Sequence, residues 1–283
     1  MTTEHTSPTG ASLDRERFAR DGFIVRRGLL PPAEVEELRA ITAAALDPLA
    51  APVEYEADVG YPGAPSGRGS LGGDTPRRLL FAFGRDAAYR RWATGTRVAR
   101  VLEEISGAND WQLSQCHHNC VMTKAPGYSS ETQWHQDIRY WSFDQPELIS
   151  VWLALGDEND RNGALRLIPG SHALSIDRGR LDRDLFLRQE LEENRALIEQ
   201  AQTVTLARGD ALFFHCRAFH AAGRNRSTET KLSCVFTYHR VDNRPIPGTR
   251  SAAFESVPVA PARASSELTA ASTDSPAGGR DGR

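Results

Sequence analysis

The chain has 283 residues, of which 40% are hydrophobic, and a formal net charge of −3 from 34 lysines and arginines against 37 aspartates and glutamates. This length suits one large domain with a sizeable core, and the balanced charge excludes the strongly basic field that nucleic acid or an anionic membrane surface attracts. No run of about 18 apolar residues occurs and residues 1–12 carry no apolar leader, so we expect a cytoplasmic protein with a small-molecule partner, no nucleic-acid partner and no membrane partner.

The N-terminal region is expected to begin with disorder over residues 1–11. Residues 13–20 predict a short helix that ends at Gly22, because glycine suits the left-handed position after a helix. Residues 22–28 then predict a strand. A second helix begins at Pro32, with glutamates in its first turn and apolar residues at helical spacing.

The next region divides into a stretch without periodicity and two stretches with a helical pattern. Residues 47–74 are rich in glycine and proline and lack periodicity, which predicts a long surface loop of the kind that is usually functional or mobile. Residues 77–93 and 95–105 predict helices, and Gly107 ends the second.

From Trp111 onward the sequence predicts short strands separated by turns, which indicates a β-sandwich or barrel. The predicted strands cover residues 112–123, 150–155, 164–168, 203–207, 211–214 and 232–238. Between them, residues 181–202 predict a charged amphipathic helix, either a lid over a barrel mouth or a solvated surface helix. Residues 251–283 are rich in alanine, serine, proline and glycine and are expected to be disordered, which leaves a single domain over residues 12–250.

Within residues 132–141, an imidazole and a carboxylate stand two residues apart, at His135 and Asp137. In an extended segment these side chains leave by the same face, while Gln136 points the other way. A nitrogen and a hard oxygen without a thiolate suit Fe(II), Mn(II) or Zn(II), and two histidines with one carboxylate are typical of non-heme Fe(II) oxygenases. Most His-x-Asp pairs are ordinary hydrogen-bonded partners, so a third ligand is required.

The best candidate for the third ligand is His220. It follows an apolar strand that starts at the turn Gly209-Asp210, and the small residues after it let a ligand approach the backbone. Lys231 comes eleven residues later, at the start of the next strand. A cation there can anchor the distal carboxylate of an anionic co-substrate that chelates the metal.

Other histidines and the cysteines have simpler interpretations. His172 is expected to fix a turn, and His215 would face the opposite side of an ideal strand from His220. The stretch 116–120 resembles a zinc cluster but has no second ligand pair at a usual spacing. The cysteines, Cys116, Cys120, Cys216 and Cys234, are expected to be buried free thiols.

Taken together, these motifs resemble the phytanoyl-CoA dioxygenase family of Fe(II)- and 2-oxoglutarate-dependent oxygenases. The matching features run in order from about residue 13 to 240. They are Gly22-Phe23-Ile24-Val25 with Gly28-Leu29-Leu30, Trp134-His135-Gln136-Asp137, Trp152, Asn162-Gly163-Ala164-Leu165, Pro169-Gly170-Ser171-His172, Gly209-Asp210, and His220 with Gly223 and Asn225.

The resemblance implies a mainly β fold with flanking helices, built on a double-stranded β-helix (a cupin-like jelly-roll barrel). It implies that His135, Asp137 and His220 ligate iron, and that Lys231 stands where the family usually has an arginine for the C5 carboxylate of 2-oxoglutarate. Lysine offers a point charge instead of a bidentate fork. Trp152, His118 and Cys120 match positions that line the co-substrate pocket in relatives.

The activity implied is hydroxylation of an unactivated C–H bond with O2 and 2-oxoglutarate, releasing succinate and CO2. Asp137 favours hydroxylation over halogenation, because halogenases of this type have glycine or alanine at that position. A small metabolite or natural-product intermediate is the expected substrate, selected by residues 47–74 and 181–202.

Two alternatives stay open from the sequence. One is a non-catalytic metal- or ligand-binding protein on the same barrel. The other is a non-oxidative cupin-type enzyme that uses Mn or Zn and needs no keto-acid anchor, which makes Lys231 the discriminating residue. The sequence carries no indication of oligomeric state.

Overall fold

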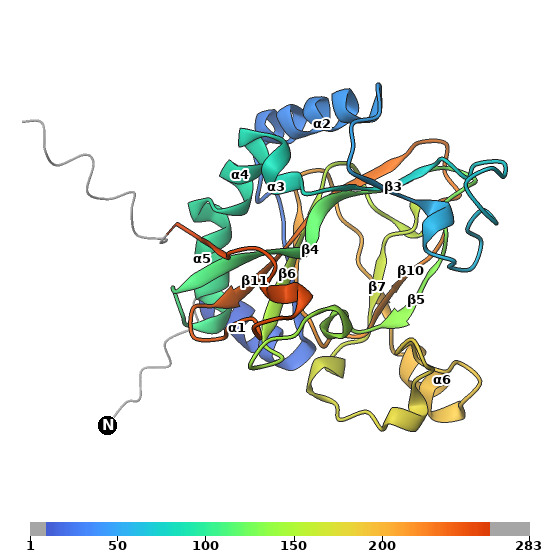
Figure 1. The fold of residues 1–283 in the computed structure, drawn as a ribbon. Helices are drawn as coiled ribbons and strands as arrows, with labels where there is room; N and C mark the ends of the chain where they lie inside the picture. Colours follow the sequence, from blue (N-terminus) through green and yellow to red (C-terminus); the bar gives the residue numbers. More distant parts are fainter. Residues whose placement is uncertain (1–9, 261–283) are drawn as a thin grey trace, which may run out of the picture.

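The computed structural model describes residues 10–260, with helices α1 to α5 on one side of a β-sandwich and α6 beside the small sheet (Figure 1). The helices are α1 (Gly10–Asp21), α2 (Pro32–Leu46), α3 (Ala82–Arg85), α4 (Ala87–Ala93), α5 (Thr96–Ser106) and α6 (Glu192–Ile198). The strands are β1 (Phe23–Arg26), β2 (Val53–Tyr55), β3 (Pro76–Leu80), β4 (Trp111–Lys124), β5 (Thr132–His135), β6 (Leu148–Ala154), β7 (Leu165–Leu167), β8 (Gln202–Thr203), β9 (Ala211–His215), β10 (His220–Ala222), β11 (Lys231–Arg240) and β12 (Val257–Pro258).

Two antiparallel sheets form the sandwich. The large sheet has the strand order β1-β9-β6-β11-β4-β3-β2, with β12 also paired to β4. The small sheet has the order β5-β10-β7-β8. This arrangement confirms the predicted mainly β architecture with flanking helices.

Alternation along the strands separates the two faces of the large sheet. Phe213 of β9 packs with the helices in the outer core, whereas Leu212 and Phe214 pack with strand β7 in the inner core between the sheets. On β6, Trp152 likewise belongs to the inner core, while its neighbours face outward. Polar side chains on these inner positions therefore point into the space between the sheets.

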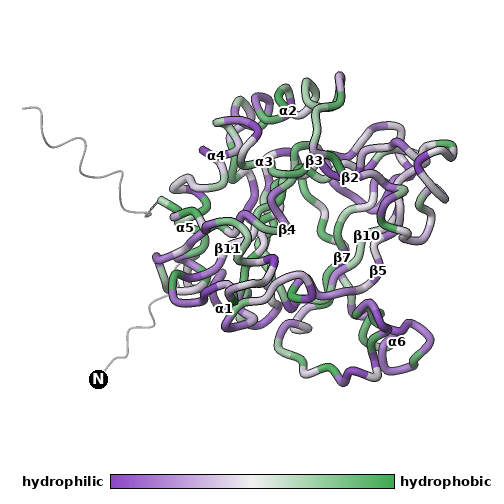
Figure 2. The backbone as a smooth tube through the Cα atoms, viewed as in Figure 1, coloured by the Kyte–Doolittle hydropathy of each residue, from purple (hydrophilic) through white to green (hydrophobic). Residues whose placement is uncertain are grey.

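Helices α1 to α5 contribute buried residues to the core on the outer face of the large sheet, whereas Leu197 of α6 packs with Trp134 and Ala221 of the small sheet. In α5 the apolar residues Val98, Val101 and Leu102 are buried, and Gly107 ends the helix at φ 81° as expected from the sequence. In Figure 2 the turns of α2 alternate between hydrophobic and hydrophilic residues, as expected for a helix with one face on a core. Among residues 10–260 no helix is long and apolar enough to cross a membrane.

The prediction of one helix over residues 77–93 is wrong at its start. Residues 76–80 form strand β3, and only then do α3 and α4 follow. The strand is fixed by distant partners: β3 pairs with β4, and Arg78 makes a two-point contact with Glu54 on β2 at 2.7 and 2.6 Å. Residues 47–74 are mainly loop, as predicted, but include β2 and a 3-10 turn.

The predicted helix over residues 181–202 is also too long. Only Glu192–Ile198 is α-helical, and residues 181–191 are irregular. Asp182 accepts hydrogen bonds from the backbone N–H groups of Asp184 and Phe186, and Leu185 has a φ of 64°. Such side-chain-to-backbone bonds compete with the helix.

The ends of the domain differ from the prediction by a few residues. Helix α1 already includes Gly10, and residues 251–260 are ordered, with β12 paired to β4. The described domain therefore extends ten residues beyond the predicted end at residue 250. The rest of the predicted disordered segments, residues 1–9 and 261–283, lie outside the described residues.

Candidate metal centre and ligand cavity

Three potential ligands meet at the edge of the small sheet. His135 is the last residue of β5 and His220 the first of β10, and the two are direct partners in the antiparallel ladder, with ring centroids 4.3 Å apart. Asp137 begins a short 3-10 helix rather than continuing β5. Gln136 between them keeps an extended backbone (φ −108°, ψ 136°), so the side chains of His135 and Asp137 leave by the same face, as expected from the sequence, and the chain turns only from Asp137 onward.

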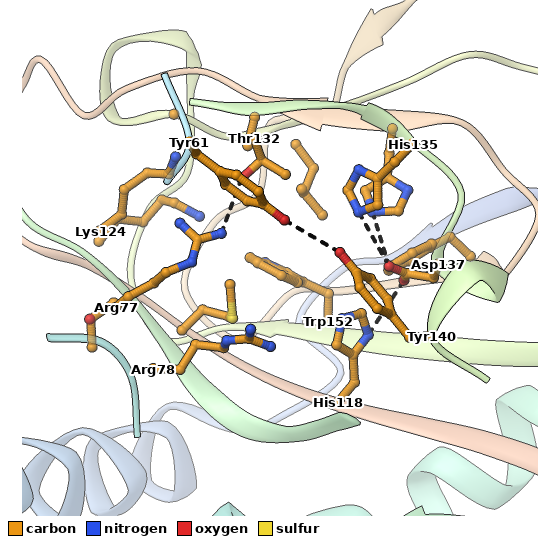
Figure 3. Close-up of a pocket in the computed structure, with 18 residues that line it drawn as sticks. Tyr61, Arg77, Arg78, His118, Lys124, Thr132, His135, Asp137, Tyr140 and Trp152 are labelled. Carbon is orange, nitrogen blue, oxygen red and sulfur yellow. Dashed lines mark hydrogen bonds and ion pairs between the residues drawn. The ribbon is translucent and has the colours of Figure 1, made fainter. Parts of the chain in front are cut away.

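The Gln136 side chain makes its contact with the loop before β10 and not with the three potential ligands. Its side-chain amide donates to the Arg217 backbone carbonyl at 2.5 Å, which ties the β5 end to the loop before β10. Oδ1 of Asp137 lies 3.5 Å from Nε2 of His135 and 3.5 Å from Nε2 of His220 (Figure 3). All three residues are buried, and their ligand atoms lie within 4.8 Å of one another.

Backbone carbonyls set the protonation of both imidazoles. Nδ1–H of His135 donates to the Gln133 carbonyl at 2.8 Å, and Nδ1–H of His220 donates to the Ala218 carbonyl at 3.0 Å. Each Nε2 then carries a free lone pair directed at the same point as Asp137. Metal-binding histidines in proteins are oriented by this kind of second contact.

The carboxylate is held ionised between these rings. Burial works against ionisation of Asp137, but the neighbouring imidazoles of His118, His220 and His135 hold its pKa well below the usual range. Oδ1 is buried and has no hydrogen-bond partner among the described residues. An ionised oxygen without a partner, facing two imidazole lone pairs, fits a divalent cation such as Fe(II).

His118 reaches the same carboxylate through an irregularity in β4. The ladder with β11 jumps from Asn119 to Ser114, so residues 115–118 bulge out of register, and His117 adopts a φ of 61°. Nδ1 of His118 lies 3.4 Å from Oδ2 of Asp137, the oxygen that does not face the two other histidines. The structure thus places the His118 ring beside the Asp137 carboxylate, while its assignment to the co-substrate pocket stays a prediction.

A cavity of about 730 Å³, including its open mouth, extends from the triad between the two sheets. Trp152 and Lys231 line it, whereas Cys120, which was also expected in the co-substrate pocket, is fully buried in the inner core, and Met122 lines the wall. The lining residues are Tyr61, Arg77, Arg78, His118, Met122, Thr123, Lys124, Thr132, His135, Asp137, Tyr140, Trp152, Gly163, Leu165, Phe214, His220, Ala222 and Lys231.

Lys231 is not a free cation. Its ammonium lies 2.8 Å from Oε2 of Glu158, and the Glu158 side chain is fully buried. The other oxygen of Glu158 accepts from the Trp152 indole at 2.9 Å and from the Ser233 hydroxyl at 2.7 Å. The sequence analysis did not identify Glu158. Its one signal in the sequence is that it is an acidic residue shortly before Asn162-Gly163.

Aromatic side chains from three segments meet beside His135. Phe186 lies against the His135 ring at 5.7 Å between centroids, and Tyr61 lies 5.7 Å from Phe186. The Tyr61 and Tyr140 hydroxyls are 3.5 Å apart. Tyr61 belongs to the 47–74 loop and Phe186 to the 181–202 segment, so both segments reach the metal centre.

The other histidines of residues 10–260 lie outside the cavity. Nε2 of His215 pairs with Glu147 at 2.9 Å, and the His215 ring neighbours His172 on the far side of β9 from the cavity. In residues 10–260 the triad is the one group of three or more His, Cys, Asp or Glu residues whose ligand atoms lie within 4.8 Å of one another. Cys116, Cys120, Cys216 and Cys234 are buried free thiols.

Comparison with known proteins agrees with this geometry. The family model for phytanoyl-CoA dioxygenase (PhyH) matches residues 18–233. Human peroxisomal phytanoyl-CoA dioxygenase is 24% identical over 243 residues, covering 78% of this chain and 67% of the human protein. The ectoine dioxygenase of Bordetella parapertussis is 27% identical over 247 residues, covering 81% of this chain and 75% of that enzyme.

A solved structure gives the same result for the fold. The non-heme α-ketoglutarate-dependent epimerase SnoN from nogalamycin biosynthesis superposes with a TM-score of 0.66 at 25% identity, covering 83% of this chain and 84% of SnoN. The likeness confirms the predicted jelly-roll barrel.

Proposed function

This chain belongs to the phytanoyl-CoA dioxygenase family and is a non-heme iron, 2-oxoglutarate-dependent dioxygenase. From that premise we propose that it hydroxylates an unactivated C–H bond of a small metabolite or natural-product intermediate. The balanced reaction converts substrate, O2 and 2-oxoglutarate to the hydroxylated product, succinate and CO2. Each O2 supplies one oxygen atom to the product and one to succinate.

The observation that carries the proposal is the buried His135, Asp137 and His220 triad at the end of a cavity. Bound Fe(II) would supply O2 activation, with the keto acid as the source of two electrons. The protein's residues hold both imidazoles with Nε2 free and keep the carboxylate ionised. Asp137 would occupy the coordination position that a halide takes in halogenases of this type, so the site favours hydroxylation.

The cavity mouth supports a small substrate held beside the metal. Tyr61, Tyr140 and Phe186 surround the side of His135 that faces outward. Rings in these positions would exclude water and fix the target C–H bond by packing. The similar proteins include one named for ectoine and one from nogalamycin biosynthesis, which supports a small-molecule substrate.

One observation favours a second candidate from another class. Glu158 neutralises Lys231, the cation expected to anchor a keto acid. A non-oxidative enzyme or metal-binding protein on this barrel would need no such anchor.

Anaerobic titration separates these candidates. Metal-free protein receives Fe(II) and then 2-oxoglutarate while the visible charge-transfer band between iron and keto acid is monitored. We expect a band that requires both additions, followed by succinate release in air. Iron binding without the band would favour the non-oxidative candidate.

The triad assignment is tested in the same titration with His135→Ala and Asp137→Ala. Each variant should lose the band and iron-dependent succinate formation, because each removes one of three ligands. His172→Ala is the matched control, since this histidine lies outside the cavity and should leave both signals intact. Wild-type behaviour in either triad variant would refute the assignment.

A further inference from the structure

The cavity wall away from the triad carries a cluster of three charged residues. Lys124 is at the end of β4, Lys231 at the start of β11, and Glu158 follows β6. Figure 3 shows Lys124 on the opposite side of the cavity from His135 and Asp137, with Trp152 between them. All three charged residues are buried, with exposed fractions of 9% for Lys124, 6% for Lys231 and 1% for Glu158.

Lys124 and Lys231 are direct partners across the β4–β11 ladder. Like charges at such a position repel each other, and burial increases the cost. Glu158 balances one of the two positive charges, that of Lys231, because it contacts Lys231 and not Lys124. The Lys124 ammonium donates to two neutral groups, the carbonyls of Gly223 at 2.6 Å and Ser130 at 2.9 Å.

The other cations of the cavity wall are already balanced. Arg78 is paired with Glu54 at 2.6 Å, and Arg77 lies 3.3 Å from both Glu54 and Glu56. Among the lysines and arginines that line the cavity in residues 10–260, Lys124 is therefore the one without a carboxylate within 4 Å. The cluster of Lys124, Lys231 and Glu158 has a net charge of +1, which matches one ligand carboxylate.

We propose that Lys124 supplies the positive charge that balances the remote carboxylate of 2-oxoglutarate, while Glu158 neutralises Lys231. The inference rests on the proposed function, since it concerns the co-substrate of the same site. A second carboxylate beside Lys231 would meet the ionised Glu158, whereas Lys124 can exchange a neutral carbonyl contact for a charged one. Hydrogen bonds between charged groups are stronger than those to neutral acceptors.

Calorimetric binding to Mn(II)-loaded protein tests this assignment without turnover. The two probes are 2-oxoglutarate and 2-oxopentanoate, which share the chelating keto-acid head but differ in the remote carboxylate. Lys124→Met should weaken 2-oxoglutarate binding roughly 10- to 100-fold, the usual effect of losing a charged hydrogen bond. Binding of 2-oxopentanoate should not change, and Lys124→Arg should recover much of the lost affinity.

Glu158 provides a test that depends on charge alone. Glu158→Gln keeps the shape of the side chain but frees the Lys231 charge, so 2-oxoglutarate should bind several-fold more tightly. In the double variant Lys124→Met with Glu158→Gln the cluster returns to a net charge of +1. We expect that variant to bind 2-oxoglutarate more tightly than Lys124→Met by itself, because the freed Lys231 charge then balances the ligand carboxylate in place of Lys124.

The outcomes separate this inference from the proposed function. If Lys124→Met leaves 2-oxoglutarate affinity unchanged, or weakens both probes equally, Lys124 is structural and the inference is overturned while the dioxygenase assignment stands. If wild-type protein that binds Mn(II) binds neither keto acid, the proposed function fails, and the inference with it. Mn(II) affinity and thermal unfolding of each variant show whether it is folded.

Discussion

At the scale of single residues, Lys124 should make co-substrate binding depend on pH. Burial first, and then the Lys231 and Arg77 charges, lower the pKa of the Lys124 ammonium to about 7. The charged groups facing it from neighbouring elements are Lys231 on β11, Arg77 on β3, and the carboxylates of Glu56 and Glu131. Because the lowered pKa lies near neutral pH, the protonation of Lys124 in the free protein should change with pH in that range.

The direction of the pH effect follows from proton uptake. Above pH 7 the free Lys124 is mainly neutral, so 2-oxoglutarate binds with uptake of a proton at Lys124. The dissociation constant of 2-oxoglutarate should therefore rise by up to about tenfold per pH unit, until the lysine of the complex also titrates. Well below pH 7 Lys124 is already protonated in the free protein, so it causes no further change in the dissociation constant of 2-oxoglutarate. Calorimetry on Mn(II)-loaded protein from pH 6.5 to 8.5 measures the effect.

The probe 2-oxopentanoate is the control for every other titrating group. It meets the same metal and the same imidazoles, so its pH profile contains their contributions without that of Lys124. A profile for 2-oxoglutarate parallel to that of 2-oxopentanoate would contradict the expected role of Lys124.

Sequence reasoning located the candidate metal ligands but not the charged residues that we propose to face the co-substrate. Local patterns point to all three: His135 and Asp137 stand two residues apart, and His220 follows an apolar strand. Lys124 and Glu158 acquire their roles only when β4, β6 and β11 lie side by side. The pairing of Lys231 with Glu158 joins residues far apart in the chain, and no local spacing encodes it.

At the scale of elements, the Gly209-Asp210 turn holds the N-terminal strand onto the large sheet. Asp210 is buried, and its carboxylate accepts from Arg27, from the Gly28 N–H at 2.7 Å and from the Ala207 N–H at 2.8 Å. Asp210→Ala leaves these donors unsatisfied and should lower the free energy of unfolding by about 3 kcal/mol. Urea denaturation measures the change.

Asp184→Ala is the matched control for Asp210→Ala, because Asp184 is exposed and its ion pair with Arg183 lies at the surface. Its effect should stay within about 0.5 kcal/mol. Equal stability of the two variants would show that the turn does not hold β1 in place.

The elements that the sequence predicted best are those with a strong period of their own. Helices α1, α2 and α5 and the strands β4, β6, β9 and β11 lie close to their predicted positions. Strand β3 and residues 181–191 were predicted as helix because their local pattern allows one. Pairing with β4 and the Asp182 side chain, respectively, favour other backbone conformations in the folded chain.

At the scale of the whole molecule, the two sheets enclose a carboxylate oxygen, Oδ1 of Asp137, that has no hydrogen-bond partner in residues 10–260. Metal binds the folded chain and not the unfolded one, because His135 and His220 come together only when β5 pairs with β10. At a metal concentration 100 times the dissociation constant, the stabilisation is about 2.7 kcal/mol. For a domain of this size that corresponds to a rise in melting temperature of roughly 5–10 °C.

Thermal unfolding of metal-free protein with added Mn(II) tests this coupling. Asp137→Ala should lose the shift, whereas His215→Ala, which removes a histidine outside the triad, should keep it. Addition of 2-oxoglutarate after Mn(II) should raise the melting temperature further, because the ligand would bridge the triad on one sheet and Lys124 on the other. A second rise equal to that from 2-oxopentanoate would mean that the remote carboxylate makes no contact across the sandwich.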